Sequence, residues 1–247
     1  MKLQRTGLTE GSLIFNQWLK TKGLYREDTE NEFINWLYST SGFYDKDIKG
    51  TYFDIMVEAV KKSVIYQRFL QEFHDSLLNS DTIHLMIHGA YHLNGQELQG
   101  EFAKRFAPVN FCFWKDFGAT IKEITEHKRV LVVSSIAQQI TDKYWTPENK
   151  LLGYSTPTTH LNNGPHKNYF ETLDQVTKDV ESMKDQFDVA LVSFGAYGCP
   201  LVDKICSMGK SAATIGSGIY EAFPVGSVPV EKRPTGWEKI EDGRYWK

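Results

Sequence analysis

The stretch Asp188-Val-Ala-Leu-Val-Ser-Phe194, followed by Gly195-Ala-Tyr-Gly198, decides the fold of this chain. Its apolar residues are consecutive and do not alternate with polar ones, which is typical of a strand buried on both faces of a parallel sheet. Two more runs of this kind lie at 129–134 and 211–215. Apolar residues three or four positions apart predict helices over 169–186 and 200–208. Because strands and helices alternate, the second half predicts βαβ units with right-handed crossovers.

The first half of the chain predicts more helix than strand. Helical patterns cover 30–38 and 52–78, and two shorter strands at 82–88 and 109–114 flank a helix over 95–106. Both halves together predict one α/β domain, with a mostly parallel sheet of about five or six strands and helices on both faces.

Three regions are expected within this single domain of residues 1–247. Residues 1–80 form a mainly helical part, 81–222 form the α/β core, and 223–247 form a tail whose tryptophans predict that it packs back on the body. Inside the core, the polar segment 147–167 interrupts the pattern. A polar segment of this length is often a lid or a binding loop, and the alternative is an ordinary surface loop.

The composition is that of an ordinary globular protein. Of the 247 residues, 41% are hydrophobic and 24% are charged, and 28 Lys+Arg against 31 Asp+Glu give a net charge of -3. This balance argues against a nucleic-acid binder, which usually carries a basic excess. Three cysteines without a metal-binding spacing indicate a reduced protein. We find no transmembrane segment and no signal peptide in the sequence, so we expect a cytoplasmic location.

Small and polar residues follow each predicted strand. They are Gly89 and Tyr91 after His88, then Ser134 and Ser135, then Gly195, Tyr197 and Gly198, and finally Gly216, Ser217 and Gly218. Strand ends of a parallel sheet lie along one edge, where ligands bind, and glycine lets the backbone approach a phosphate closely. The pattern therefore predicts a phosphate-bearing ligand, with the two tyrosines as candidates to stack on its base or sugar. The alternative is that the glycines only form tight turns.

A dinucleotide site fits these turns poorly. Gly195-x-x-Gly198 is not the G-x-G-x-x-G pattern, and no acidic residue ends the strand at 211–215. The chain also lacks the phosphate-binding loop of nucleotide triphosphatases.

Asp28-Thr-Glu30 is a second candidate site, with Arg26 beside it. Two carboxylates at this spacing point the same way from an extended segment and suit Mg²⁺ or Mn²⁺, while the arginine suits a phosphate. The alternative is that Asp28 caps a helix whose first turn contains the other acids.

Three segments of the chain resemble the GT-D-type glycosyltransferase family of polysaccharide biosynthesis clusters. They are 129–140, 188–201 and 209–218; the ending at 237–246 and the openings at 26–30 and 41–44 are also similar. The resemblance implies a Rossmann-like nucleotide-sugar fold. It also implies a D-x-E motif, matched by Asp28 and Glu30, that meets a divalent metal (Mn²⁺ or Mg²⁺) and the donor diphosphate.

The expected function is therefore glycosyl transfer from a UDP-, GDP- or dTDP-sugar to a carbohydrate acceptor, without nucleic acid. Asp28 and Glu30 would hold the metal, whose charge stabilises the leaving group. The glycine turns would receive donor phosphates or acceptor hydroxyls. His88, Glu32 and Asp116 remain open as the base. The alternative is a nucleotide- or carbohydrate-binding module of the same fold that has lost catalysis.

Overall fold

The computed structural model describes residues 1–25, 27–48, 55–84, 95–106, 110–111, 114–160 and 163–223. Its centre is one sheet of seven parallel strands in the order β3-β2-β1-β7-β6-β4-β5. The strands are β1 (Lys2–Arg5), β2 (Thr82–His84), β3 (Asn110–Phe111), β4 (Val130–Ser134), β5 (Leu152–Ser155), β6 (Val189–Ser193) and β7 (Ser211–Thr214). The α/β architecture is thus confirmed, with one or two strands more than the sequence predicts.

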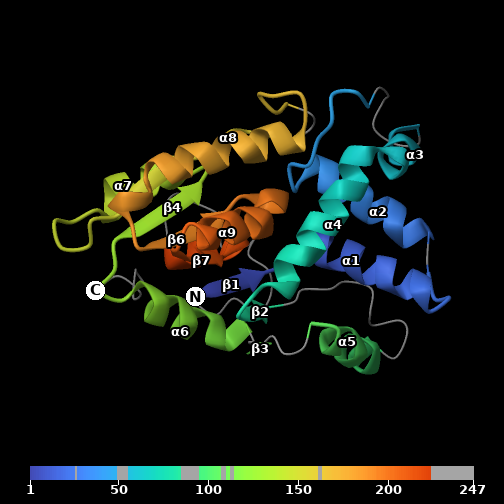
Figure 1. Ribbon diagram of the computed structural model, residues 1–247, viewed down its shortest axis with the longest axis horizontal. Coiled ribbons are helices and arrows are strands. Elements are labelled where there is room, and N and C mark those ends of the chain that lie inside the picture. Colours follow the sequence, from blue (N-terminus) through green and yellow to red (C-terminus); the bar gives the residue numbers. More distant parts are fainter. Residues whose placement is uncertain are drawn as a thin grey trace.

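Helices cover both faces of the sheet (Figure 1). On the first face the core contains residues of α1 (Leu8–Thr21), α2 (Glu27–Ser39), α3 (Ile55–Lys62), α4 (Val64–Leu78), α5 (Gly95–Lys104), α8 (Tyr169–Ser182) and α9 (Gly198–Ser207). On the second face it contains residues of α6 (Trp114–Thr125), α7 (Ala137–Tyr144) and α10 (Ile219–Ala222). No helix in the described part of the chain is long and apolar enough to cross a membrane.

The central strands divide their side chains between these two cores. In β4, Leu131 and Val133 enter the first core, whereas Val130 and Val132 enter the second. Successive side chains of a strand point to opposite faces, so a strand covered by helices on both sides must be apolar throughout. The consecutive apolar runs of β4 and β6 are explained by this burial.

Strand β1 was not expected from the sequence, yet it lies inside the sheet. Leu3 pairs with Thr82 of β2 on one side and with Ala213 of β7 on the other. Only Leu3 is apolar among its four residues, so no apolar run marks this strand. The N-terminal region is therefore not only helical: it supplies one of the inner strands of the core.

Two other elements differ from the sequence-based expectation. The helix predicted over 52–78 breaks at Ser63, whose hydroxyl accepts from the backbone N–H groups of Ile65 (3.1 Å) and Tyr66 (3.4 Å) and so caps α4. The polar segment 147–167 contains β5, which pairs with β4. The tail after residue 223 lies outside the described residues.

Candidate functional site

At two positions along the carboxyl edge of the sheet, neighbouring strands continue into helices on opposite faces. The chain leaves β1 for α1 on the first face, and it leaves the neighbouring strand β7 for α10 on the second face. It diverges in the same way between β6, which is followed by α9, and β4, which is followed by α7. Ligands of open parallel sheets bind at the carboxyl ends of strands where connections diverge in this manner.

At the first divergence, Arg5 ends β1 and lies against the turn that follows β7. Its side chain is 7% exposed, Nη1 donates to the carbonyl oxygen of Ile215 (2.8 Å), and Nη2 donates to Oγ of Ser217 (3.4 Å). Gly216 has a φ of +50°, and a Cβ at this position would lie 2.5 Å from Nη1 of Arg5. Glycine is therefore needed both for the left-handed backbone and for the close approach of the guanidinium.

Glu10 brings a carboxyl group to the same place from the first turn of α1. It is 3% exposed, and its carboxylate folds back over Gly7, where any Cβ would overlap it. Burial raises the pKa of Glu10 above its ordinary value, although hydrogen bonding and the charge of Arg5 act in the opposite direction. We call Arg5, Glu10, Gly216 and Ser217 the β1/β7 edge.

A serine of β6 supports the turn of the β1/β7 edge. Ser193 donates from Oγ to the carbonyl oxygen of Gly216 (2.8 Å), which ties the end of β6 to the turn after β7. Ser217 is exposed at the tip of this turn, whereas Gly218 behind it is buried. The predicted residues 216–218 therefore form a supported turn with one accessible hydroxyl.

At the second divergence, the chain itself occupies the predicted phosphate-binding turn after β6. Gly195 has a φ of +47°, and a Cβ there would overlap the carbonyl oxygen of Ser41. The same carbonyl accepts from the backbone N–H of Ala196 (2.8 Å). An amide that we expected to face a ligand is thus engaged by the segment after α2.

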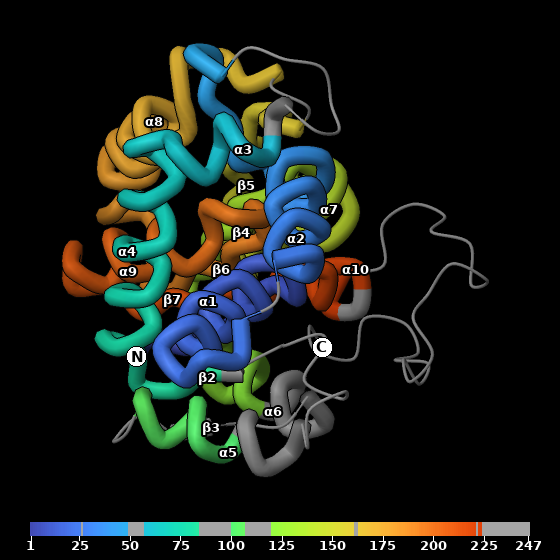
Figure 2. The backbone as a smooth tube through the Cα atoms, turned by 90° about the vertical axis from the view of Figure 1, so that its right-hand side faces the viewer, coloured from blue at the N-terminus to red at the C-terminus, as the bar shows by residue number. Residues whose placement is uncertain are grey.

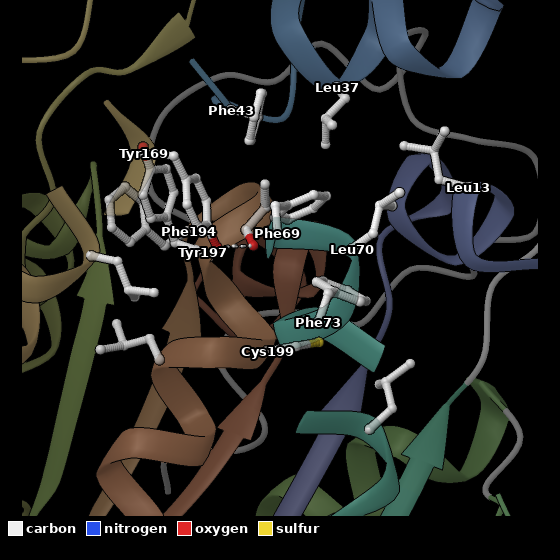
Figure 3. Packing of buried hydrophobic residues seen from close by; sticks show 14 of the residues in the cluster. Leu13, Leu37, Phe43, Phe69, Leu70, Phe73, Tyr169, Phe194, Tyr197 and Cys199 are labelled. Atoms are coloured by element: carbon white, nitrogen blue, oxygen red, sulfur yellow. Dashed lines mark hydrogen bonds between the residues drawn. The ribbon is translucent and has the colours of Figure 1, made fainter. Parts of the chain in front are cut away.

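Tyr197 is buried and does not offer a ring face to a ligand, contrary to our expectation. Its ring lies between Tyr169 (centroids 4.3 Å apart) and Phe194 (4.2 Å), as Figure 3 shows. Tyr169 in turn donates its hydroxyl to the carbonyl oxygen of Ala196 (3.0 Å). Gly198 is buried as well, so the helix start that we predicted as a ligand site is part of the aromatic core.

The two serines after β4 lie at the same edge as the glycine turns. Ser134 is buried, and its Oγ accepts from the backbone N–H of Ile136 (3.3 Å). Ser135 is exposed. The prediction that these strand ends share one edge is therefore met by the topology, and only their binding role stays a prediction.

Asp28 and Glu30 lie in the first turn of α2, as the helix alternative expected of the acids. The helix begins at Glu27, however, so Asp28 lies inside it and is not its N-cap. Glu30 is 3% exposed and accepts from Nε2 of Gln17 on one oxygen and from the hydroxyl of Tyr25 on the other. Gln17 lies seven residues after Glu10 along α1, which is about 10 Å at 1.5 Å per residue. Helices α1 and α2 lie side by side (Figure 2). Because Gln17 holds Glu30, the acidic pair lies about that far along α1 from Glu10, and so away from the β1/β7 edge that it was expected to face.

The described residues do not fit a metal site at this pair. Both oxygens of Glu30 already accept hydrogen bonds, and on a helix two side chains at i and i+2 diverge. No group of three or more His, Cys, Asp or Glu side chains suited to a metal occurs among the described residues.

The other candidates are only partly located by the structure. Glu32 is exposed on α2 and Asp116 belongs to α6 on the second face. Arg26, His88, Gly89 and Tyr91 lie outside the described residues.

Sequence reasoning missed Arg5 and Glu10 because it missed β1. One signal was present: Arg5-Thr-Gly7 separates a short extended stretch from a helical pattern that includes Leu13, Ile14 and Trp18. This is the same strand, glycine turn and helix order as after β6 and β7.

No model of a known protein family and no curated protein matches this sequence. A search of solved structures finds one described as a new glycosyltransferase (DUF1792) from Streptococcus sanguinis, with 12% sequence identity and a TM-score of 0.46. The match covers 87% of this chain and 74% of that one.

Proposed function

We propose that this protein transfers a glycosyl group from a nucleotide-sugar donor to a carbohydrate acceptor at the β1/β7 edge. The observation that carries the proposal is the buried guanidinium of Arg5 against the Gly216 turn, at a divergence of strand connections. The resemblance of 129–140, 188–201 and 209–218 to a glycosyltransferase family supplies the reaction class.

Arg5 suits the diphosphate of such a donor. A guanidinium is permanently charged, and its planar fork of N–H groups matches the oxygens of a phosphate. When the bond between the anomeric carbon and the diphosphate oxygen breaks, negative charge grows on the leaving diphosphate. A positive charge held in place by Ile215 and Ser217 stabilises that charge without having to reorganise.

Glu10 suits the proton transfer of the same step. The acceptor hydroxyl oxygen bonds to the anomeric carbon as the diphosphate leaves, and the hydroxyl proton passes to the carboxylate of Glu10. A raised pKa brings this carboxyl closer to neutral pH, where a general base works best. No step is assigned to a metal, because the described residues at Asp28 and Glu30 do not fit one.

The test is a charge reversal at the exposed turn residue. In Ser217→Glu the new carboxylate sits next to Arg5 and competes with a donor phosphate. In the matched control, Ser207→Glu, the same charge is placed at an exposed serine at the end of α9, at the opposite end of the helix from Gly198. We expect a UDP-, GDP- or dTDP-sugar to raise the melting temperature of the wild type and of Ser207→Glu, and not that of Ser217→Glu.

A second measurement distinguishes a glycosyltransferase from a non-catalytic binding module. The donor that stabilises the protein is incubated with a mixture of oligosaccharide acceptors, and the release of free nucleotide is measured. Release supports the transferase. Stabilisation without release supports a binding module. If no nucleotide sugar stabilises the protein, or if Ser217→Glu responds like the wild type, the β1/β7 edge is not the donor site.

A further inference from the structure

A groove between α1, α4 and α5 lies outside the site described so far. It has a volume of about 310 Å³, which is within the range of small-molecule sites. Trp18 and Leu70, each 8% exposed, contribute apolar surface to it, and the more deeply buried Ile14 and Phe102 complete the apolar lining.

The groove follows the face of α1 that begins with Glu10. Ile14, Gln17, Trp18 and Thr21 line it from α1, and they lie four, seven, eight and eleven residues after Glu10. Residues at these spacings share one face of a helix. At 1.5 Å per residue the lining runs from about 6 to about 16 Å along the axis from Glu10.

Three glutamine amides line the groove, and each is oriented by a bond from its nitrogen. Gln67 donates from Nε2 to the carbonyl oxygen of Lys61 (2.9 Å), and Gln71 donates to Oδ1 of Asp75 (2.8 Å). Gln17 donates to Glu30. Each amide nitrogen carries two hydrogens and uses one of them in these bonds. Each amide can therefore offer a ligand its carbonyl oxygen as an acceptor and its second N–H as a donor.

Arg105 supplies donors at the α5 side of the groove. Its Nε donates to Nε2 of His74 (3.2 Å), and the other ring nitrogen of His74, Nδ1, faces Oδ1 of Asp75 (3.5 Å). The guanidinium is exposed and fixed in direction by this bond. No aspartate or glutamate lines the groove among the described residues.

We propose that this groove binds sugar residues of a neutral carbohydrate acceptor. Amide carbonyl oxygens need a ligand that donates hydrogen bonds, which phosphates and carboxylates do not do, whereas hydroxyl groups both donate and accept. Sugar hydroxyls can therefore satisfy the three amides and accept from Arg105, while the apolar face of a sugar ring lies against the apolar lining. As an acceptor site the groove rests on the proposed function, because it leads along α1 toward Glu10.

This assignment gives Glu30 a role. By holding Nε2 of Gln17, Glu30 and Tyr25 fix an amide of the groove from behind. Glu30 is then a positioning residue for the acceptor.

The experiment measures binding of neutral tetrasaccharides of glucose, galactose and N-acetylglucosamine by saturation-transfer NMR and calorimetry, with a hyaluronan tetrasaccharide as the anionic probe. Gln71→Ala and Arg105→Ala remove exposed side chains of the groove. Gln175→Ala is the matched control, because Gln175 is exposed on α8 and donates to Asp179 four residues later at the same 2.8 Å. Melting temperatures confirm that the variants fold.

We expect at least one neutral tetrasaccharide to bind the wild type and Gln175→Ala equally, and its dissociation constant to rise tenfold or more in each groove variant. The proposal is overturned if no neutral probe binds at millimolar concentration, if only the anionic probe binds, or if both groove variants bind like the control. The rise in melting temperature that a nucleotide sugar causes is measured separately for the wild type and the same variants. If the wild type binds no carbohydrate but a nucleotide sugar still raises its melting temperature, only the groove proposal fails. If a carbohydrate binds in the groove but no nucleotide sugar raises the melting temperature, only the donor-site proposal fails.

Discussion

At the scale of the residue, Glu10, which we propose as the base, shows how a buried carboxyl reduces stability at neutral pH. Burial of the charged form outweighs the hydrogen bonds and the attraction of Arg5, so the pKa of this group is raised in the folded protein. A carboxyl of this kind stabilises the fold when it is protonated. That contribution is complete below the unfolded pKa of about 4.3 and is lost as the pH rises through the higher folded pKa.

Glu10→Gln keeps the shape of the side chain and removes the buried charge. We expect this variant to melt a few degrees higher than the wild type at pH 7, since about 1 kcal/mol moves the melting temperature of a domain of this size by about 2–4 °C. The difference should vanish below pH 4, where the wild-type carboxyl is also neutral. Thermal melts from pH 3 to pH 8 measure it, with Glu181→Gln on the exposed side of α8 as the control.

The same variant should lose glycosyl transfer, because an amide does not take up the acceptor proton. Gain of stability together with loss of activity is the pattern expected of an active-site residue. A melting temperature below that of the wild type at pH 7 would show that Glu10 is kept for its pairing with Arg5 instead.

At the scale of the element, the contact between the turn after β6 and the segment after α2 is tested by adding one methyl group. Gly195 and Gly209 both have a positive φ, +47° and +82°, but a Cβ at 209 meets nothing within 4 Å, whereas a Cβ at 195 overlaps the backbone of Ser41. Gly209→Ala should cost only the left-handed backbone, about 1–2 kcal/mol.

Gly195→Ala should cost at least twice as much in the free energy of unfolding, because the steric overlap also breaks the bond from Ala196 to Ser41. Urea unfolding of the two variants checks this. Equal losses would mean that the segment after α2 moves aside freely and that the turn is open to a ligand after all.

Elements that are determined by their own residue pattern were predictable from the sequence. Elements that depend on contacts with distant parts of the chain were not. The consecutive apolar residues of β4 and β6 mark them as buried strands wherever they pair. In β1, Gln4 is buried because its Nε2 donates to the carbonyl oxygens of Ser76 and Cys199, and Arg5 because it donates to Ile215. These partners lie 72 to 210 residues away, and no local pattern encodes them.

The prediction of a metal site formed by an extended segment at Asp28 and Glu30 was wrong for a related reason. The local sequence around Asp28 indicates both an extended acidic motif and a helix start, and only packing on α1 decides between them. Once α2 lies on α1, Glu30 finds Gln17 and Tyr25 and becomes buried. The glycine turns after β6 and β7 lie at the sheet edge as predicted, yet of these two only the one after β7 has Arg5 against it.

At the scale of the whole molecule, α1 connects the two proposed sites. Its first turn brings Glu10 to the β1/β7 edge, and its later turns line the groove with α4 and α5. A donor bound at Ser217 and an acceptor bound at Gln71 share no side chain in this arrangement. Effects of substitutions at distant sites without shared partners usually add in free energy, within about 0.3–0.5 kcal/mol.

Ser217→Ala and Gln71→Ala should therefore act independently on transfer. We expect the first to raise KM for the donor only and the second to raise KM for the acceptor only. For each substrate, the loss of kcat/KM in the double variant should equal the product of the losses in the two single variants. We expect agreement within about twofold, because an additivity error of about 0.5 kcal/mol corresponds to a factor of about two in kcat/KM. Steady-state kinetics with the donor and tetrasaccharide found above measure all four proteins. A double variant no worse than the weaker single variant would place both residues in one site, and the groove would then bind the donor instead of a separate acceptor.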